Sequence, residues 1–99
     1  MQLEFNDDEL ERLAYDPQAH TTRWGPDVTK AFQRVLFYIA NAEDERDIRA
    51  SKGLRLEKLK GKRAGTWSVR INSKYRLILR FETSADAKVA VVIEAVDYH

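Results

Sequence analysis

The spacing of apolar residues changes once along this chain, near Gly53, and no other feature constrains the fold as strongly. Before Gly53 the apolar residues recur every three or four positions, which is typical of helices with one buried face. After it they alternate with polar residues, as they do in half-buried strands. Helices followed by a run of strands indicate an α+β fold. With 99 residues, the chain is expected to form a single domain over 1–99.

The first half is expected to contain one strand and two or three helices. Residues 2–6 suggest a short edge strand, and the helix that follows ends before Pro17 because proline disfavours helical backbone in the preceding residue. The main core helix begins near Pro26, since proline suits the first helical position, and runs to about Ala42. Residues 43–50 are highly charged and form either a short helix or an ordered linker.

The second half is expected to be an antiparallel meander. Leu54 and Leu56 suggest a short strand, and 60–65 is a basic, turn-rich loop. Three further strands are predicted at 66–72, 74–81 and 88–96. Their short connections favour antiparallel pairing. We therefore expect an α+β fold in which an N-terminal strand and two or three helices pack on one face of a mainly antiparallel sheet.

Charge is segregated along the chain although the formal net charge is only +1. The first 50 residues hold six Lys and Arg against eleven Asp and Glu, whereas 51–99 hold eleven against five. Between Lys52 and Arg80 the only acid among ten basic residues is Glu57. A basic half of this kind favours binding of a polyanion, although a solvated basic surface would give the same pattern.

Alternation places three arginines on one face of the predicted sheet. Arg70, Arg76 and Arg80 fall opposite the apolar side chains of their strands, with no acid between them in those strands. Clustered like charges destabilise a sheet unless a polyanion or a partner relieves them. The expected phosphate-binding set is this face with the loop at its rim, namely Lys60, Lys62, Arg63, Arg70 and Arg80.

The chain ends in Asp97-Tyr98-His99, directly after a strand that is apolar except for Glu94. A terminal histidine is usually frayed, but here no long tail separates it from a buried strand. Histidine is the side chain best suited to proton transfer near neutral pH. These three residues are therefore candidates for catalysis.

Other features narrow the class of protein. The chain has no cysteine and two histidines, so we expect no structural metal and no cofactor. No apolar run is long enough to span a membrane, and the acidic start is unlike a signal peptide, which together fit a cytoplasmic protein without membrane association.

Residues 53–76 resemble the most recognisable segment of HigB toxins. The resemblance is carried by Gly53-Leu54-Arg55-Leu56, Lys60-Gly61, Trp67-Ser68-Val69-Arg70 and Tyr75-Arg76. These toxins belong to the RelE/ParE superfamily of type II toxin–antitoxin systems. The terminal Val96-Asp97-Tyr98-His99 also resembles the end of that family. The two motifs cover roughly half of the chain, and the helical half agrees only in layout.

The resemblance implies an endoribonuclease that inhibits translation by cutting mRNA in the 30S decoding site of the 70S ribosome. It also implies a helix-turn-helix antitoxin of the HigA type that inhibits the toxin in a hetero-oligomer. By position, Lys60 and Arg76 would bind phosphate and stabilise the transition state, and Arg70 would be a basic contact. The catalytic cluster implied is Asp97, Tyr98, His99 and Arg76, with Glu57 where some relatives have histidine.

Such residues suit cleavage without a metal, in which the 2′-hydroxyl attacks the adjacent phosphorus. His99 would transfer a proton, and either Glu57 or Asp97 would be the base or orient the imidazole. Tyr98 would stack on a base or donate a hydrogen bond. Two alternatives remain open, a ParE-like toxin that binds DNA gyrase and an RNA-binding protein without catalysis.

The remaining aromatic residues and the second histidine have simpler interpretations. His20 is expected in a loop, and Trp67 in the core. Trp24, Phe37 and Tyr38 belong either to the core or to a surface that binds the antitoxin.

Overall fold

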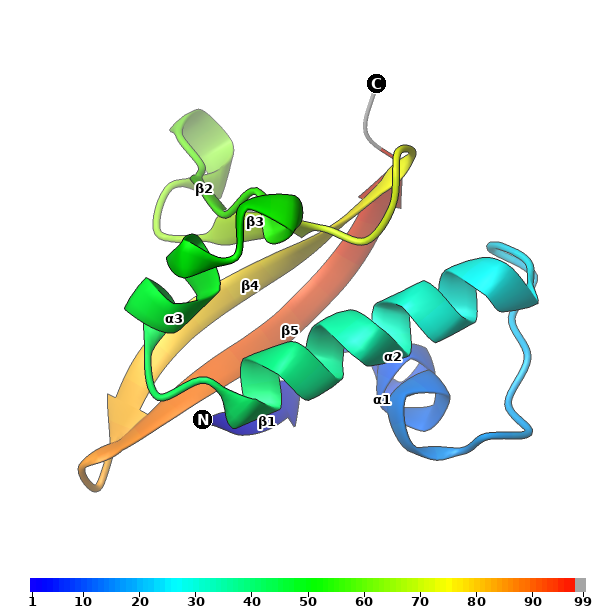
Figure 1. The fold of residues 1–99 in the computed structure, drawn as a ribbon, viewed down its shortest axis with the longest axis horizontal. Coiled ribbons are helices and arrows are strands. Elements are labelled where there is room, and N and C mark those ends of the chain that lie inside the picture. The colour runs from blue at the N-terminus through cyan, green and yellow to red at the C-terminus, as the bar shows by residue number, and fades with distance from the viewer. Residues whose placement is uncertain (98–99) are drawn as a thin grey trace.

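The computed structural model of the chain describes residues 1–97. In this part of the chain the elements are β1 (Gln2–Phe5), α1 (Asp8–Tyr15), α2 (Pro26–Asn41), α3 (Glu45–Ala50), the 3₁₀ helix η1 (Lys52–Leu54), β2 (Glu57–Lys58), the 3₁₀ helix η2 (Gly61–Arg63), β3 (Trp67–Arg70), β4 (Tyr75–Ser84) and β5 (Ala87–Asp97). The predicted order of one strand, helices and then a run of strands is confirmed (Figure 1). Residues 43–50 contain a short helix, which settles the choice between helix and linker.

The strands form one sheet in the order β1-β5-β4-β3-β2. Each strand from β2 to β5 pairs antiparallel with the next one along the chain, which is the predicted meander. At one edge of the sheet, β1 pairs parallel to β5. β4 and β5 are the longest strands and meet in a tight turn, with Ser84 opposite Ala87. At their other end Tyr75 lies opposite Asp97, so the described part of β5 ends beside the turn that leads into β4 (Figure 1).

The helices begin where the sequence supplies capping groups. The Asp7 carboxylate accepts a hydrogen bond from the Leu10 N–H at the start of α1, and Asp44 does the same for the Arg46 N–H at the start of α3. α2 instead begins with Pro26, whose fixed φ suits the first helical position.

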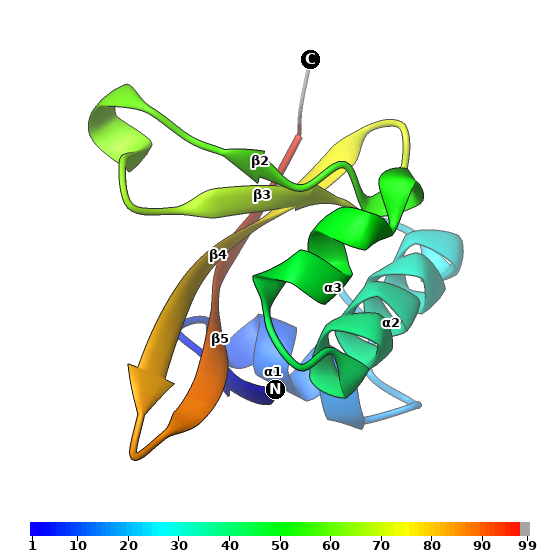
Figure 2. The ribbon, with the colours of Figure 1, turned by 60° about the vertical axis from the view of Figure 1, so that its left-hand side comes forward.

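All three helices contribute to a core on one face of the sheet. Phe32 and Ile39 of α2 are fully buried with Leu10 of α1 and Ile48 of α3, against strand residues that include Leu77. Burying side chains of this size stabilises the fold by roughly 1.5–3 kcal/mol each. In Figure 2, α2 and α3 stack on one side of the long β4–β5 ribbon, and the segment between β2 and β3 projects away from them.

A β-bulge divides β5 into two parts. Ile78 pairs with Glu94 and Leu79 pairs with Val92, so Ile93 is an extra residue without a partner. A bulge reverses the alternation of faces beyond it and increases the local twist. Val91 and Glu94 therefore lie on the same face of the sheet although three positions separate them.

One element was predicted wrongly. Leu54 and Leu56 do not form a strand, because Leu54 ends η1 and Arg55 then adopts a left-handed conformation with φ 48°. The chain becomes extended only afterwards, at Glu57–Lys58. Leu54 is buried in the core. The spacing of Leu54 and Leu56 therefore reflects packing against the core after a short helix and not the alternation of faces along a strand. Within 1–97 no helix has both the length and the apolar character needed to cross a membrane.

Candidate functional site

The three arginines singled out in the sequence share one face of the sheet, opposite the core. We call this side the arginine face and define it by Arg70, Arg76 and Arg80. Arg70 and Arg76 are direct cross-strand partners between β3 and β4, and Arg80 pairs with Val91 of β5. The register across the sheet adds a row beside them, which consists of Glu57, Ser68, Ile78 and Glu94.

Arg76 lies inside this face and not on it, since only 7% of the residue is exposed. Its Nε donates to the Ser68 hydroxyl at 3.0 Å, and its Nη2 donates to the Arg55 carbonyl at 2.6 Å and to the Ser68 carbonyl at 3.4 Å. Ser68 is itself 1% exposed. A buried cation needs such acceptors because burial removes its hydration. Arg76 therefore connects β4 to β3 and to the segment before β2.

The arginine face also carries acids, which the expectation of an acid-free face missed. Glu94 lies there because of the bulge, and its carboxylate forms an ion pair with Arg63 at 2.5 Å. Arg80 pairs with Glu82 of the same strand at 2.6 Å. These two predicted phosphate-binding residues are thus partly neutralised by neighbours, and a polyanion would have to compete for them.

The Arg63–Glu94 pair also shows on which side of the sheet the loop between β2 and β3 lies. It joins η2 to β5 across the arginine face, so the loop projects over this face. Lys60 and Lys62 lie in or beside η2 and are exposed, and neither makes an ion pair within residues 1–97. Glu57, in β2, is also exposed. The predicted basic rim is therefore next to the face, as the sequence indicated.

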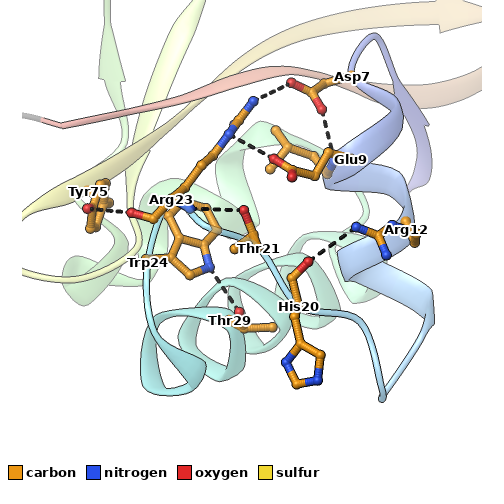
Figure 3. A network of polar contacts seen from close by, with 10 residues as sticks. Asp7, Glu9, Arg12, His20, Thr21, Arg23, Trp24, Thr29 and Tyr75 are labelled. Atoms are coloured by element: carbon orange, nitrogen blue, oxygen red, sulfur yellow. Dashed lines mark hydrogen bonds and ion pairs between the residues drawn. The ribbon is translucent and has the colours of Figure 1, made fainter.

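The described end of β5 lies beside a loop of the helical half. Asp97 pairs in register with Tyr75, which puts its side chain on the face opposite Arg70 and Arg76, and its carboxylate lies 3.7 Å from Lys74 Nζ. The Tyr75 hydroxyl donates to the Arg23 carbonyl at 3.2 Å, and the Trp24 ring packs edge-on against Tyr75 at 5.2 Å (Figure 3). Tyr98 and His99, the other two predicted terminal site residues, lie outside the described residues.

A polar network holds that loop in place. Arg23 bridges Asp7 at 3.1 Å and Glu9 at 2.9 Å, and Trp24 Nε1 donates to the Thr29 hydroxyl at 2.9 Å (Figure 3). Burial alone would raise the pKa of Asp7, but the Leu10 N–H and Arg23 outweigh it and lower the pKa below 3.8. Sequence reasoning missed this support for Tyr75, because the residues of the network lie 46 or more positions away along the chain.

The aromatic residues fall into two groups. Trp24 is half-buried and packs against the core, while Phe37 is 73% and Tyr38 41% exposed on α2. Trp67 lies half-buried at the margin of the core, beside Phe81 and beneath the cations of Arg49 and Lys58. Trp24 therefore belongs to the core, as one of its two interpretations held, and Phe37 does not. Trp67 was expected in the core but is only half-buried and also contacts two cations.

The chemistry open to this site is that of donors and cations. Among residues 1–97 no group of three or more His, Cys, Asp or Glu side chains is arranged to hold a metal ion. Lysines and arginines at the face and its rim suit an anionic ligand, and Glu57 of β2 borders this face, whereas the Asp97 side chain lies on the opposite face at the described end of β5.

The fold is similar to that of toxins of the YoeB and ParE type. A YoeB/ParE toxin from Agrobacterium tumefaciens superposes with a TM-score of 0.57 at 20% identity, covering 100% of both chains. A chain of a YoeB–YefM complex from Staphylococcus aureus superposes with a TM-score of 0.55 at 20% identity, covering 100% of this chain and 97% of the other. At such low identity the likeness concerns the fold.

The sequence defines the family more closely. Residues 3–99 match the family model described as RelE-like toxin of type II toxin-antitoxin system HigB. Toxin HigB-1 of Vibrio cholerae is 38% identical over 82 residues, which is 82% of this chain and 84% of the relative. The chain belongs to the HigB-like toxins of type II toxin–antitoxin systems. The resemblance seen in residues 53–76 and at the terminus is thereby confirmed.

Proposed function

We propose that this toxin is an endoribonuclease that cuts mRNA on the ribosome and so inhibits translation in the cytoplasm. The observation that carries the proposal is the family match, which runs through both the 53–76 motif and the terminal Asp97-Tyr98-His99. A sheet face that carries Arg70, with exposed Lys60 and Lys62 at its rim, supports it, because such donors suit phosphate oxygens.

The proposed reaction needs no metal. The 2′-hydroxyl loses its proton and attacks the adjacent phosphorus, the bond from phosphorus to the 5′-oxygen breaks, and that oxygen takes a proton. His99 transfers one of these protons, and Glu57 or Asp97 is the base or orients the imidazole. Lys60 stabilises the charge that develops on the phosphorane. The products are a 2′,3′-cyclic phosphate and a 5′-hydroxyl.

Arg76 has a different part in this proposal from the one its sequence position suggested. Its guanidinium donates to Ser68 and to the Arg55 carbonyl within the fold. We infer that it chiefly holds the β2–β3 segment against β4. Direct stabilisation of the phosphorane then falls to Lys60, with Arg70 as a phosphate contact.

An antitoxin partner follows from the family, whose members are toxins of toxin–antitoxin systems. The solved relatives include toxin–antitoxin complexes from Staphylococcus aureus. We propose that a helix-turn-helix antitoxin of the HigA type binds this chain in a hetero-oligomer. The exposed Phe37 of α2, which lines a groove with Leu3, Tyr15 and Leu36, provides apolar surface for such contact, and Tyr38 of the same helix is exposed as well.

Mapping the cleavage of an mRNA by purified toxin, with and without 70S ribosomes, tests this function. We expect cuts only when ribosomes are present, with cyclic phosphate and 5′-hydroxyl ends. Ends that carry a 5′-phosphate would refute the proposed chemistry. Inhibition of gyrase supercoiling without any cleavage would replace the proposal with a ParE-like activity.

A further inference from the structure

A small polar pocket opens where the turn between β3 and β4 meets the segment before β2. It has a volume of about 300 Å³ and is lined by Arg55, Arg70, Asn72, Ser73 and Arg76. Among residues 1–97 the lining contains three guanidinium groups and no carboxylate. Arg76 is the buried member, and its bond to the Arg55 carbonyl fixes the backbone on the far side of the pocket.

The two other arginines take part in no ion pair with the described residues. The ion pairs within residues 1–97 involve Arg23, Arg46, Arg63, Lys74 and Arg80, and neither Arg55 nor Arg70 takes part in one. Arg55 is exposed and Arg70 half-exposed. Two unpaired guanidinium groups beside a third repel one another, so the arrangement is relieved when an anion binds between them.

Asn72 adds an oriented donor. Its Oδ1 accepts from the Lys74 N–H at 2.9 Å and the Tyr75 N–H at 2.7 Å. Since both contacts are N–H donors, the amide cannot be reversed, and its NH₂ group is left to donate elsewhere. With the Ser73 hydroxyl, the pocket thus offers neutral and charged donors together, which is the set that phosphate oxygens accept from.

The backbone at Arg55 supports a role in binding. Arg55 has φ 48° and ψ 55°, a left-handed conformation that costs energy for any residue with a Cβ. Glycine would adopt it freely, and asparagine tolerates it better than arginine does. Strained residues of this kind are concentrated at functional sites. An arginine at this position is explained if its side chain is needed in the pocket.

We propose that this pocket binds one phosphate of the RNA backbone, with Arg55 and Arg70 as its ligands, Asn72 as a neutral donor and Arg76 as the positioning residue. The proposal rests on the proposed function and deepens it, because it adds a phosphate site at the edge of the arginine face where the β3–β4 turn meets the segment before β2. The pocket anchors the RNA strand at a position separate from the Lys60 rim.

Arg55→Gly provides the sharpest test, because it removes the side chain and suits the backbone. The matched control is Lys88→Gln, which removes one charge from the exposed far end of β5. Each variant is titrated by NMR with a short 2′-O-methyl oligoribonucleotide, which cannot be cleaved, at several salt concentrations. We expect Arg55→Gly to raise the Kd about tenfold or more and to reduce the salt slope by about 0.7, while Lys88→Gln leaves both unchanged.

The melting temperature separates binding from structure. Arg55→Gly should leave Tm unchanged or raise it, whereas a residue with only a structural role would lower it. Unchanged oligonucleotide binding by Arg55→Gly would overturn the pocket. If wild-type toxin still cut ribosome-bound mRNA in that case, the proposed function would stand. Loss of antitoxin binding with RNA binding intact would also overturn the proposal, since the pocket would then hold a carboxylate of the protein partner.

Discussion

The buried guanidinium of Arg76 should contribute to stability whether or not it contacts RNA. Arg76→Met keeps most of the side-chain length and removes the donors to Ser68 and to the Arg55 carbonyl. Charged hydrogen bonds contribute about 1.5–3 kcal/mol each, and part of this is offset because a buried charge no longer has to be desolvated. We expect the free energy of unfolding to fall by about 2–4 kcal/mol.

Urea unfolding followed by tryptophan fluorescence measures this loss, since the chain has two tryptophans. Arg80→Met is the matched control, because Arg80 lies on the same strand and face but its partner Glu82 is a solvent-exposed ion-pair neighbour. It should change stability by less than about 1 kcal/mol. A double-mutant cycle with Ser68→Ala should give a coupling energy of about 1 kcal/mol. A loss below about 0.5 kcal/mol for Arg76→Met would refute the reasoning that Arg76 ties β4 to its neighbours.

Three further predictions concern regions away from the arginine face. Asp7→Asn should keep the cap of α1 but weaken the dependence of stability on pH. The folded pKa of Asp7 lies below 3.8, so its carboxylate stabilises the fold above about pH 4, and this contribution is lost as the pH falls through the folded pKa. Acid titration of both proteins by circular dichroism measures the difference. In the β4–β5 turn, Ala85 and Asp86 have φ of 49° and 67°, a region that asparagine and glycine adopt at lower cost. Ala85→Asn combined with Asp86→Gly should therefore raise the free energy of unfolding by about 1–2 kcal/mol. An unchanged denaturation midpoint would contradict this. Phe37→Ser should change the free energy of unfolding by less than about 0.5 kcal/mol because the ring is 73% exposed. It should nevertheless weaken antitoxin binding at least tenfold, as measured by calorimetry. Unchanged antitoxin affinity would show that Phe37 is not part of the antitoxin-binding surface.

Local signals in the sequence were sufficient for most of the fold. The helix that begins at Pro26 and the strands around Val69 and Leu77 follow from capping residues and from the period of the apolar side chains. These signals extend over a few residues, and they can be recognised without knowing which helices or strands pack against each element. The pairing of β1 with β5, across most of the chain, was not deduced, because register between distant strands depends on tertiary packing.

The candidate site was predicted less completely than the fold. Alternation correctly put Arg70 and Arg76 on one face, but it could not show that Arg76 is buried by Ser68 and the Arg55 carbonyl. The bulge at Ile93 was also hidden, because an extra residue at the end of the apolar run from Val89 to Ile93 leaves no mark in the sequence. For that reason Glu94 was not placed on the arginine face.

The left-handed backbone at Arg55 was missed for a similar reason. Glycine and asparagine are the usual signals for this conformation, and here an arginine adopts it. Since local propensity disagrees with the observed backbone, tertiary contacts must impose it, and the bond from Arg76 to the Arg55 carbonyl is one of them. A disagreement of this kind between sequence and backbone is itself a reason to look for function.

The proposed cleavage of RNA depends on His99 as a proton-transfer group. The most direct measurement is the single-turnover rate of mRNA cleavage on ribosomes for wild-type protein, His99→Ala and His20→Ala. His20 is the chain's other histidine, lies exposed before the Arg23 loop, and serves as the matched control. We predict that His99→Ala lowers the rate by about 10²–10⁴-fold and that His20→Ala leaves it unchanged. Equal cleavage rates for His99→Ala and wild type would contradict the account.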